Sequence, residues 1–509
     1  MLPCKPWQDV SGIWAEAMNS MPLLSLLFLT LPAGAALSWL LPRPEWAKRI
    51  ALAAALVDLC IAIAVVVRFD PSESGFQLVE QANWIPTLNI QYLVGVDGIS
   101  VLFLPATVLL FIGVILASWN SVTVLPRLYY SLLLLLETST LGIFCSLDTM
   151  LFFLFWELSL VPLYFLVSLW GIGPNRRYAA VKYILVMLAG GIPLLFGFVL
   201  LAYNHAALSG SLAFDLPTLL ATPMGAKLEI TVFLLLLLGF AVKTPLFPLH
   251  TWLPLMAMEG PAAVTALLLG IKLGAYGLIR FVIPLAPHAA HQMHWLLVGL
   301  GTIAVLYGAV AALAQSNLRR MLAYASLSHV GLVVLGLSST DLQGLQGAVM
   351  QLLNFTFAAG GAFLLVGALH HRIGSTDLLN LGGGARSMPL LASFLLLFGL
   401  AGMGMPGTSG FPAELLILLS VLSNHMGAGL AALFAMILGA AYFLGQYRRA
   451  FFGPAKNPVV ADAMDLRPRE LAICVLYAAI ILIVGFYPSL VLDVIKPTGE
   501  AWVAHLQRH

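Results

Sequence analysis

Charged residues are scarce in this sequence. Only 9% of its 509 residues are Asp, Glu, Lys or Arg, and 61% are hydrophobic, whereas soluble domains carry about 25% charged residues. A water-soluble protein of this length is therefore excluded. The net charge is +2, and no basic stripe or arginine-rich arm is present to neutralise a phosphate backbone, so nucleic acid is not expected as a partner.

Cofactor motifs are also missing. The four cysteines, Cys4, Cys60, Cys145 and Cys474, lie singly, without the C-x-x-C pairs or the histidine spacing of zinc and iron–sulfur sites. The glycine run 382–384 falls in an expected loop and lacks the preceding strand of a phosphate-binding motif. We therefore expect no metal and no cofactor in this chain, and any redox group that drives it must lie elsewhere.

Long apolar runs, by contrast, follow one another almost from end to end. Their lengths predict an all-α polytopic membrane protein with about fourteen transmembrane helices, since roughly 20 apolar residues cross a bilayer. The start of the chain lacks the basic region of a signal peptide, so we expect an external extension over residues 1–20 and a retained first span. The spans are centred near residues 31, 58, 108, 138, 160, 191, 236, 273, 304, 329, 357, 400, 436 and 482.

Basic residues divide unevenly between the two sides of these spans. Of the 24 Lys and Arg residues, alternating loops place sixteen on one side and six on the other, among them Arg280. The remaining two, Lys243 and Lys272, lie inside spans. By the positive-inside rule the side with sixteen faces the cytoplasm. Because the number of spans is even, both termini are expected on the external side.

Four charged residues lie deep inside apolar runs: Glu157, Lys243, Lys272 and Glu414. A charge at bilayer depth costs about 2.5–3.5 kcal/mol on insertion scales, and such residues usually face the protein interior and mark an ion or proton pathway. Snorkelling of a lysine to the interface is the alternative. Lys272 lies in the middle of its run, which favours the pathway.

The spacing of the buried groups predicts a repeat. Lys243 and Glu414 are 171 positions apart (414 − 243), and Glu157 and His329 are 172 apart (329 − 157), five spans in each case. An odd number of spans repeated once gives an inverted repeat, as in many secondary transporters. We expect helices 1–3 over 21–128, antiporter-like repeat 1 with helices 4–8 over 129–290, repeat 2 with helices 9–13 over 291–450, and a cytoplasmic loop, the last helix and an external C-terminal tail over 451–509.

Helix-breaking residues accompany one buried charge in each repeat. Lys243 is followed by Pro245, Pro248 and Pro254, and Glu414 follows a segment rich in glycine and proline, residues 402–412. Proline removes a backbone donor, and in a membrane the freed polar groups are tolerated only against protein or a watery cavity. The sequence therefore predicts broken helices near Lys243 and Glu414, on the transport route.

Several other ionisable groups allow two interpretations. Glu137, after a leucine run, is either a second membrane carboxylate or a helix-end residue. His329 is either a core residue or a relay group; its place in the repeat, and the near-neutral intrinsic pKa of histidine side chains in general, favour the relay. Lys182 is either a cytoplasmic anchor or a secondary pathway residue. For Asp97 we expect a helix N-cap with a packing role.

These residues belong to motifs that together resemble a known family. The motifs are D-G-I-S at 97–100, L-F-F-L-F-W-E-L-S-L-V-P at 151–162, F-A-V-K-T-P-L-F-P-L-H-T-W-L-P at 240–254, I-K-L-G-A-Y-G at 271–277, R-R-M-L-A-Y-A-S-L-S-H-V-G at 319–331 and G-M-P-G at 404–407. They resemble subunit M of proton-pumping NADH:quinone oxidoreductase (complex I) and the antiporter-like family shared with Mrp antiporters. The resemblance covers about the whole chain beyond residue 20.

The resemblance implies a fourteen-helix subunit with two inverted five-helix repeats and a route for protons. Glu157 and Lys243 would form a charge pair in the first half-channel, Lys272 and His329 the central connection, and Glu414 the exit. It implies a bacterial inner membrane location and neighbouring membrane subunits, including further antiporter-like ones. NADH, FMN, iron–sulfur clusters and quinone would belong to partner subunits, and this chain would carry no redox centre.

The sequence departs from this family at two places. After Trp252-Leu253-Pro254 the family usually continues D-A-H, but here Leu255, Met256 and Ala257 follow; Phe355 stands where a histidine is usual. Our first hypothesis is a proton-translocating subunit of a respiratory NADH:quinone oxidoreductase. The alternatives are an equivalent subunit of a cation/proton antiporter, a hydrogenase or a carbon-uptake complex, or a structural subunit without pumping.

Overall fold

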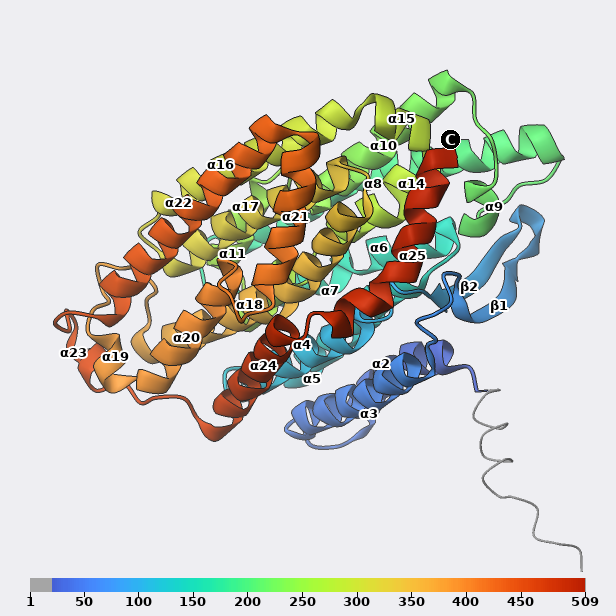
Figure 1. Ribbon diagram of the computed structural model, residues 1–509. Coiled ribbons are helices and arrows are strands. Elements are labelled where there is room, and N and C mark those ends of the chain that lie inside the picture. Colours follow the sequence, from blue (N-terminus) through green and yellow to red (C-terminus); the bar gives the residue numbers. More distant parts are fainter. Residues whose placement is uncertain (1–20, 509) are drawn as a thin grey trace, which may run out of the picture.

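The structure, a computed structural model, describes residues 21–508 and is a bundle of long helices (Figure 1). The expected extension 1–20 lies outside these residues. Eleven segments of the described chain are long and apolar enough to cross a membrane, and three shorter apolar helices lie beside them. The expectation of a polytopic helical membrane protein is confirmed, while the count of fourteen crossings remains a prediction.

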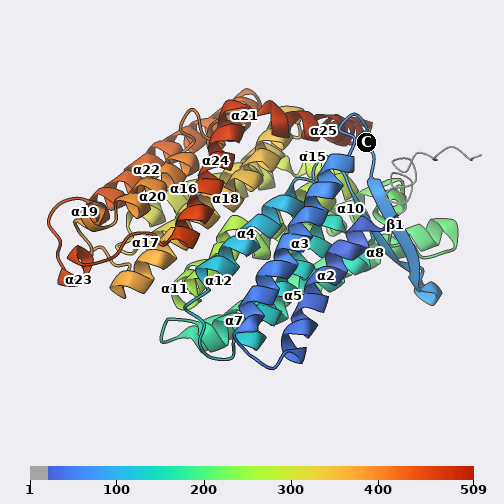
Figure 2. The same ribbon diagram turned by 90° about the horizontal axis from the view of Figure 1, so that it is seen from below.

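The first part of the chain contributes three helices and a hairpin. Helices α2 and α3 form a two-helix layer along one side of the bundle (Figure 2). The elements are α2 (Leu23–Leu40), α3 (Trp46–Arg68), β1 (Gln77–Ile85), the 3-10 turn η1 (Pro86–Leu88), β2 (Ile90–Val96) and α4 (Phe103–Ala117).

The next part holds the first set of buried charges. Its elements are α5 (Pro126–Cys145), α6 (Thr149–Leu158), α7 (Leu160–Trp170), α8 (Arg176–Ser209), α9 (Leu216–Leu220), α10 (Ala226–Lys243), α11 (Trp252–Glu259), α12 (Ala262–Gly270), α13 (Leu273–Gly277), the π-helix η2 (Leu278–Val282), α14 (Ile283–Leu285) and α15 (Pro287–Gln292).

The last part holds the second set and the C-terminal helices. Its elements are α16 (His294–Leu313), α17 (Leu318–Ser338), α18 (Leu342–Ile373), α19 (Gly384–Ser387), α20 (Pro389–Gly402), α21 (Gly410–Asn424), α22 (Met426–Phe451), α23 (Pro458–Ala461), α24 (Pro468–Phe486) and α25 (Ser489–Arg508).

The hairpin β1–β2 was not predicted from the sequence. Its strands pair antiparallel, with Ala82 opposite Tyr92, and it lies at the end of the bundle opposite α19 and α23 (Figure 1). Glu80 on β1 accepts hydrogen bonds from the backbone N–H groups of Leu24 and Ser25 at 2.7 and 2.9 Å. Because the first N–H groups of a helix lack intrahelical partners, Glu80 caps α2 and fixes the hairpin to it.

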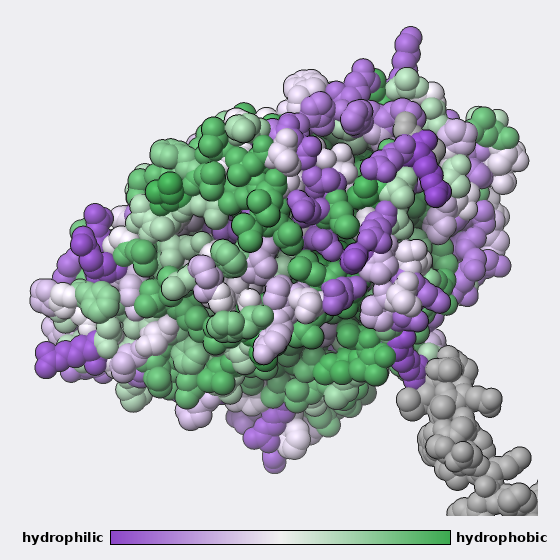
Figure 3. Space-filling model, in the orientation of Figure 1, coloured by the Kyte–Doolittle hydropathy of each residue, from purple (hydrophilic) through white to green (hydrophobic). Residues whose placement is uncertain are grey.

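Burial separates an inner set of helices from an outer set. In the apolar stretches of α5 and α18, 89% of the residues are buried, against 28% in α3 and α24. A helix that is apolar on all sides is stable in water only as a core element, but in a bilayer its outer face meets lipid. The outer set therefore supplies the apolar band seen on the surface over α16, α20 and α22, with hydrophilic residues gathered towards the two ends (Figure 3).

Four helices of the bundle are interrupted. The predicted break near Lys243 is confirmed between α10 and α11, and that near Glu414 between α20 and α21. In the second break Gly404 and Gly407 have φ of +65° and +87°, which glycine adopts without steric cost. Two further interruptions separate α6 from α7 and α12 from α13. These two interruptions lie beside Glu157 and at Lys272. They were not predicted from the sequence.

Candidate functional site: a row of charges at helix interruptions

Lys243 is the last residue of α10, and its ammonium group reaches the interruption in the neighbouring helix. Its Nζ donates to Ser159 Oγ at 2.9 Å and to the Trp156 carbonyl at 3.4 Å. The same nitrogen lies 3.9 Å from the centre of the Trp156 ring, a cation–π contact. A positive charge is favoured here because the Trp156 carbonyl belongs to the negative, C-terminal end of α6.

Glu157 lies on the same interruption but not in direct contact with Lys243. Its carboxylate packs against Gly191 of α8, where a side chain would collide with it, and its Oε1 is buried without a hydrogen-bond partner. The two charges act on each other through space, yet no direct ion pair joins them in the described chain. The charge pair implied by the resemblance is thus present as neighbours rather than as a closed salt bridge.

A buried N-cap fixes the start of the helix that carries Glu157. Asp148 accepts hydrogen bonds from the backbone N–H groups of Met150 and Leu151 at 2.9 and 3.0 Å, and from Gln91 of β2 at 3.1 Å. Burial raises the pKa of the Asp148 carboxyl, while these three donors oppose the rise. The cap joins α6 to the hairpin and so holds Glu157 at a defined depth.

Lys272 occupies the gap between α12 and α13. Its side chain is 5% exposed, and its Nζ donates to the carbonyl of Leu268 in the last turn of α12 at 3.0 Å. This carbonyl belongs to the negative end of the helix dipole. The residues from 21 to 508 provide no hydrogen bond or ion pair between Lys272 and His329, so the structure does not close the central connection that the resemblance implies.

Glu414, in the first turns of α21, is the centre of a polar cluster. Its Oε1 lies 3.5 Å from His329 Nδ1 and accepts a hydrogen bond from Gln351 Nε2 at 3.2 Å. Asn354 Nδ2 donates to Gln351 Oε1 at 3.4 Å, and Ser409 Oγ donates to Asn354 Oδ1 at 2.7 Å. The structure therefore pairs His329 with Glu414.

Sequence reasoning gave Gln351 and Asn354 no role. Their spacing of three residues on α18 places both amides on one helix face, and both side chains are at most 2% exposed. Two amides on one face of an otherwise apolar segment were the signal that could have revealed this part of the polar cluster.

Two small cavities meet at His329. One, of about 50 Å³, is lined by Ser326, Phe355 and Tyr442 among others; the second, of about 20 Å³, reaches Glu414. A cavity of roughly 10–15 Å³ already holds one water. The Phe355 ring lies 5.8 Å from the His329 ring, so Phe355 forms an apolar wall beside His329.

The remaining departures and secondary residues lie around this row. Ala257 is fully buried and Leu255 is half-buried on α11, so an apolar surface replaces the usual acid and histidine. Lys182 is half-buried on α8. Glu137 lies on α5, fully buried, with neither carboxyl oxygen hydrogen-bonded.

Arg280 corrects one expectation from the sequence. It was assigned to an external loop, but it is 7% exposed within η2 and forms an ion pair with Asp97, donating through its two terminal nitrogens at 2.7 and 2.5 Å. Asp97 Oδ1 also accepts from the backbone N–H groups of Ile99 and Ser100. Asp97 therefore caps a turn before α4, where a helix N-cap was expected. No local sequence pattern indicated its ion pair with Arg280.

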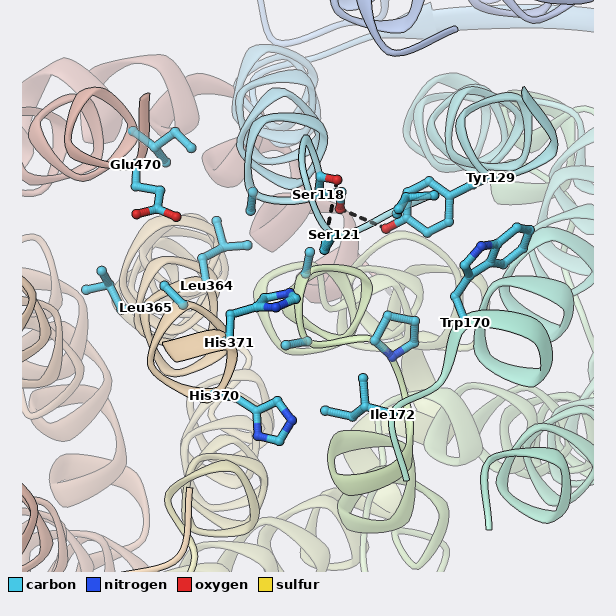
Figure 4. Close-up of a pocket in the computed structure, with 18 of the residues that line it drawn as sticks. Ser118, Ser121, Tyr129, Trp170, Ile172, Leu364, Leu365, His370, His371 and Glu470 are labelled. Atoms are coloured by element: carbon cyan, nitrogen blue, oxygen red, sulfur yellow. Dashed lines mark hydrogen bonds between the residues drawn. The ribbon is translucent and has the colours of Figure 1, made fainter. Parts of the chain in front are cut away.

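A separate cavity of about 130 Å³ lies away from the row (Figure 4). It is lined by residues such as His370, His371, Trp170 and Glu470, and the Tyr129 hydroxyl at its wall hydrogen-bonds Ser118 Oγ at 2.8 Å. None of the charged residues of the row lines it. Within the described residues, no group of three or more His, Cys, Asp or Glu side chains is arranged to hold a metal ion.

Comparison with known proteins identifies the family to which this chain is similar. The family described as NADH:quinone oxidoreductase/Mrp antiporter, transmembrane, matches residues 146–439. NADH-quinone oxidoreductase subunit M of Rhodobacter capsulatus is 35% identical, with 90% of each chain covered. F(420)H(2) dehydrogenase subunit M of Methanosarcina mazei is 33% identical, with 95% of this chain and 98% of the relative covered.

A solved structure is similar to this chain over nearly the whole length of both. A chain of respiratory complex I from Thermus thermophilus with bound NADH is 32% identical and superimposes with a TM-score of 0.87, covering 96% of this chain and 100% of that one. These similarities extend over nearly the whole length of the chain. The chain therefore belongs to the NADH:quinone oxidoreductase/Mrp antiporter family of membrane subunits.

Proposed function

We propose that this chain is the proton-translocating subunit M of a respiratory NADH:quinone oxidoreductase. The observation that carries the proposal is the position of Glu157, Lys243, Lys272 and Glu414, each buried or half-buried at a helix interruption, in a chain similar to such subunits over nearly its whole length. Intramembrane ionisable groups of this kind mark proton pathways.

Lys243 would move protons by changing partners. In the structure its ammonium is held by the Ser159 hydroxyl and the Trp156 ring, while Glu157 stands nearby with a free carboxyl oxygen. If Lys243 approached Glu157, the charged form of Lys243 would be stabilised. If the two side chains separated, Lys243 would more readily release its proton towards Lys272. Water joining His329 would carry that proton on to Glu414.

The route must be closed between these steps. One charge that crosses the membrane stores about 2.3 kcal/mol per 100 mV, which simple leakage would dissipate. Lys272 turns back onto its own helix end at Leu268, and Phe355 walls off part of the His329 cavities. We infer that the segment between Lys272 and His329, which no hydrogen bond joins in the described residues, is the closed gate between the two halves.

Two inverted five-helix repeats would provide the two halves, over 129–290 and 291–450. Helix lengths support this: α5 and α16 both have 20 residues, and α8 and α18 have 34 and 32. A broken helix follows α8 and α18 in each case. Two further expectations, fourteen crossings and both termini on the external side of a bacterial inner membrane, belong to the same proposal.

The electron donor lies outside this chain in the proposal. NADH, FMN, iron–sulfur clusters and quinone would be bound by partner subunits, and further antiporter-like subunits would flank this one in the bilayer. The names of the relatives include both an NADH-quinone oxidoreductase and an F(420)H(2) dehydrogenase, so the test must use the complete complex. Subunits that copurify with the chain would identify its electron-input module.

The test is a measurement of coupling in the reconstituted complex. Lys243→Ala and Glu157→Ala should assemble and support quinone reduction but lose proton uptake into proteoliposomes. The matched control is Lys227→Ala, because Lys227 lies on the same helix α10 but is exposed. Full coupling in the Lys243 and Glu157 variants would refute the proposal and favour a structural subunit.

A further inference from the structure

Two buried carboxylic acids lie outside the row of charges. Asp58 on α3 and Glu137 on α5 are both 0% exposed. Asp58 Oδ1 accepts a hydrogen bond from the Thr30 hydroxyl of α2 at 3.0 Å, whereas Asp58 Oδ2 and both oxygens of Glu137 have no hydrogen-bond partner in the described residues. The helices that carry them, α3 and α5, pack against each other, and α2, which carries Thr30, packs against both.

Among residues 21–508, no positive charge is found that compensates this pair. Along α3 the nearest basic residues are Arg49 and Arg68, nine and ten positions from Asp58, and on α5 Arg127 is ten positions from Glu137. At 1.5 Å per residue these separations are about 13–15 Å. The helices α2 and α4 carry no titratable group.

The other elements packed against the pair contribute no cation either. Their titratable side chains are ones that are acidic or neutral at pH 7: Glu80, Tyr92, Tyr129, Tyr130, Cys145, Glu157 and Tyr164. An ionised carboxylate buried without a partner is strongly unfavourable, and two such charges side by side repel each other. The state with both groups ionised is therefore excluded unless something positive binds there.

We propose that Asp58 and Glu137 form a proton-binding carboxyl pair, a second proton site beside the Glu157–Lys243 half of the row. At least one proton resides on the pair at neutral pH, and it occupies the oxygens that no protein group satisfies. The Thr30 hydroxyl donates to Asp58 Oδ1, which leaves Asp58 Oδ2 and the two Glu137 oxygens as the atoms available to hold the proton. Two interacting acids of this kind titrate as a unit rather than as separate residues.

The position of the pair distinguishes it from the row. It lies where the α2–α3 layer packs on α5 (Figure 2). α5 leads through a short turn into α6, which carries Glu157, and the Phe28 ring of α2 lies 5.7 Å from the Phe155 ring of α6. A change of charge at the pair would therefore act on α6 and on Glu157 from the neighbouring helix α5. The proposal that the pair binds a proton does not require that the chain pumps protons.

Infrared difference spectroscopy of the assembled complex tests the assignment. The C=O stretching band of a protonated carboxyl, identified by its shift in D₂O, should change in Asp58→Asn and in Glu137→Gln and should lose intensity in the double variant. Asp70→Asn is the matched control, because Asp70 lies in the loop after α3, exposed and bonded to Ser72. An unchanged band in the double variant would overturn the proposal.

A variant of Thr30 and a titration with Na⁺ test the pair in two further ways. Thr30→Val preserves shape and removes the donor to Asp58, so it should shift the carbonyl frequency even if a carboxyl variant fails to assemble; no shift would count against the pair. A carboxylate band that responds to Na⁺ in the wild type and not in the double variant would mean that a monovalent cation, not a proton, occupies the site, and would also overturn the proposal.

Discussion

The buried ion pair between Asp97 and Arg280 provides a stringent test of the structure. Asp97→Asn keeps the size of the side chain and its two hydrogen bonds from Ile99 and Ser100, but removes the charge. Arg280, 7% exposed, then remains a buried cation whose polar partners, the amide introduced at position 97 and the Tyr276 hydroxyl 3.2 Å from its Nε, are both neutral. The substitution thus isolates the cost of an uncompensated buried cation.

The magnitude follows from that geometry. Removing one partner of a buried pair typically costs about 3–5 kcal/mol, because the other charge loses compensation. Arg280→Gln should cost less, since Asp97 retains its two backbone donors. In the double variant the two effects should not add, and the double-mutant cycle should give a coupling of about 0.5–3 kcal/mol.

The free energy of unfolding of the detergent-solubilised protein measures these effects. The control is Glu500→Gln, which removes the exposed pair with Lys496, 4.0 Å apart and more than half exposed on both sides; an exposed pair contributes about 0–1 kcal/mol. If Asp97→Asn costs no more than Glu500→Gln, Arg280 has another partner or is not buried, and the reasoning is refuted.

Two further predictions concern the second half of the row. Gly404→Ala should destabilise the protein by about 1–2 kcal/mol, because φ is +65° there and the new methyl group would collide with the Glu414 carboxylate; thermal unfolding measures this, and Gly402→Ala, with no atom within 4 Å of the added Cβ, should be neutral. Phe355→His should raise the rate of coupled proton uptake, because it replaces the apolar wall beside His329 with a partner for water; an equal or lower rate in proteoliposomes would show that this wall does not limit transfer.

The sequence was sufficient to find four of the charges that lie inside apolar segments. Glu157, Lys243, Lys272 and Glu414 stand out because each interrupts an apolar run, and proline and glycine near two of them indicated the broken helices that the structure confirms. The family expectation was confirmed by the comparisons over most of the chain. Gly270, Gly274 and Gly277 flank Lys272 and could have indicated the break there, whereas the break beside Glu157 has only Pro162 close to it; neither break was predicted.

Long-range partners were beyond sequence reasoning. Arg280 and Asp97 are 183 positions apart, so nothing local distinguishes this arginine from one in a loop. The hairpin was missed because the side chains of β1 are mostly exposed or half-exposed, so its strand lacks a clear apolar alternation. Asp58, however, could have been found, because it interrupts an apolar run as Glu157 does.

The structure separates two ways of holding a charge inside this membrane protein. Asp97 and Arg280 neutralise each other directly, so removing either charge should harm the fold. Lys243 and Lys272 are instead held by carbonyl groups at helix ends and by a hydroxyl, interactions worth about 0.3–2 kcal/mol at a helix terminus. Such partners are strong enough to retain a lysine and weak enough to let it change neighbours. A neutral side chain at Lys243 leaves no buried counter-charge in direct contact, and this is why its variants can be expected to assemble and report on proton transfer alone.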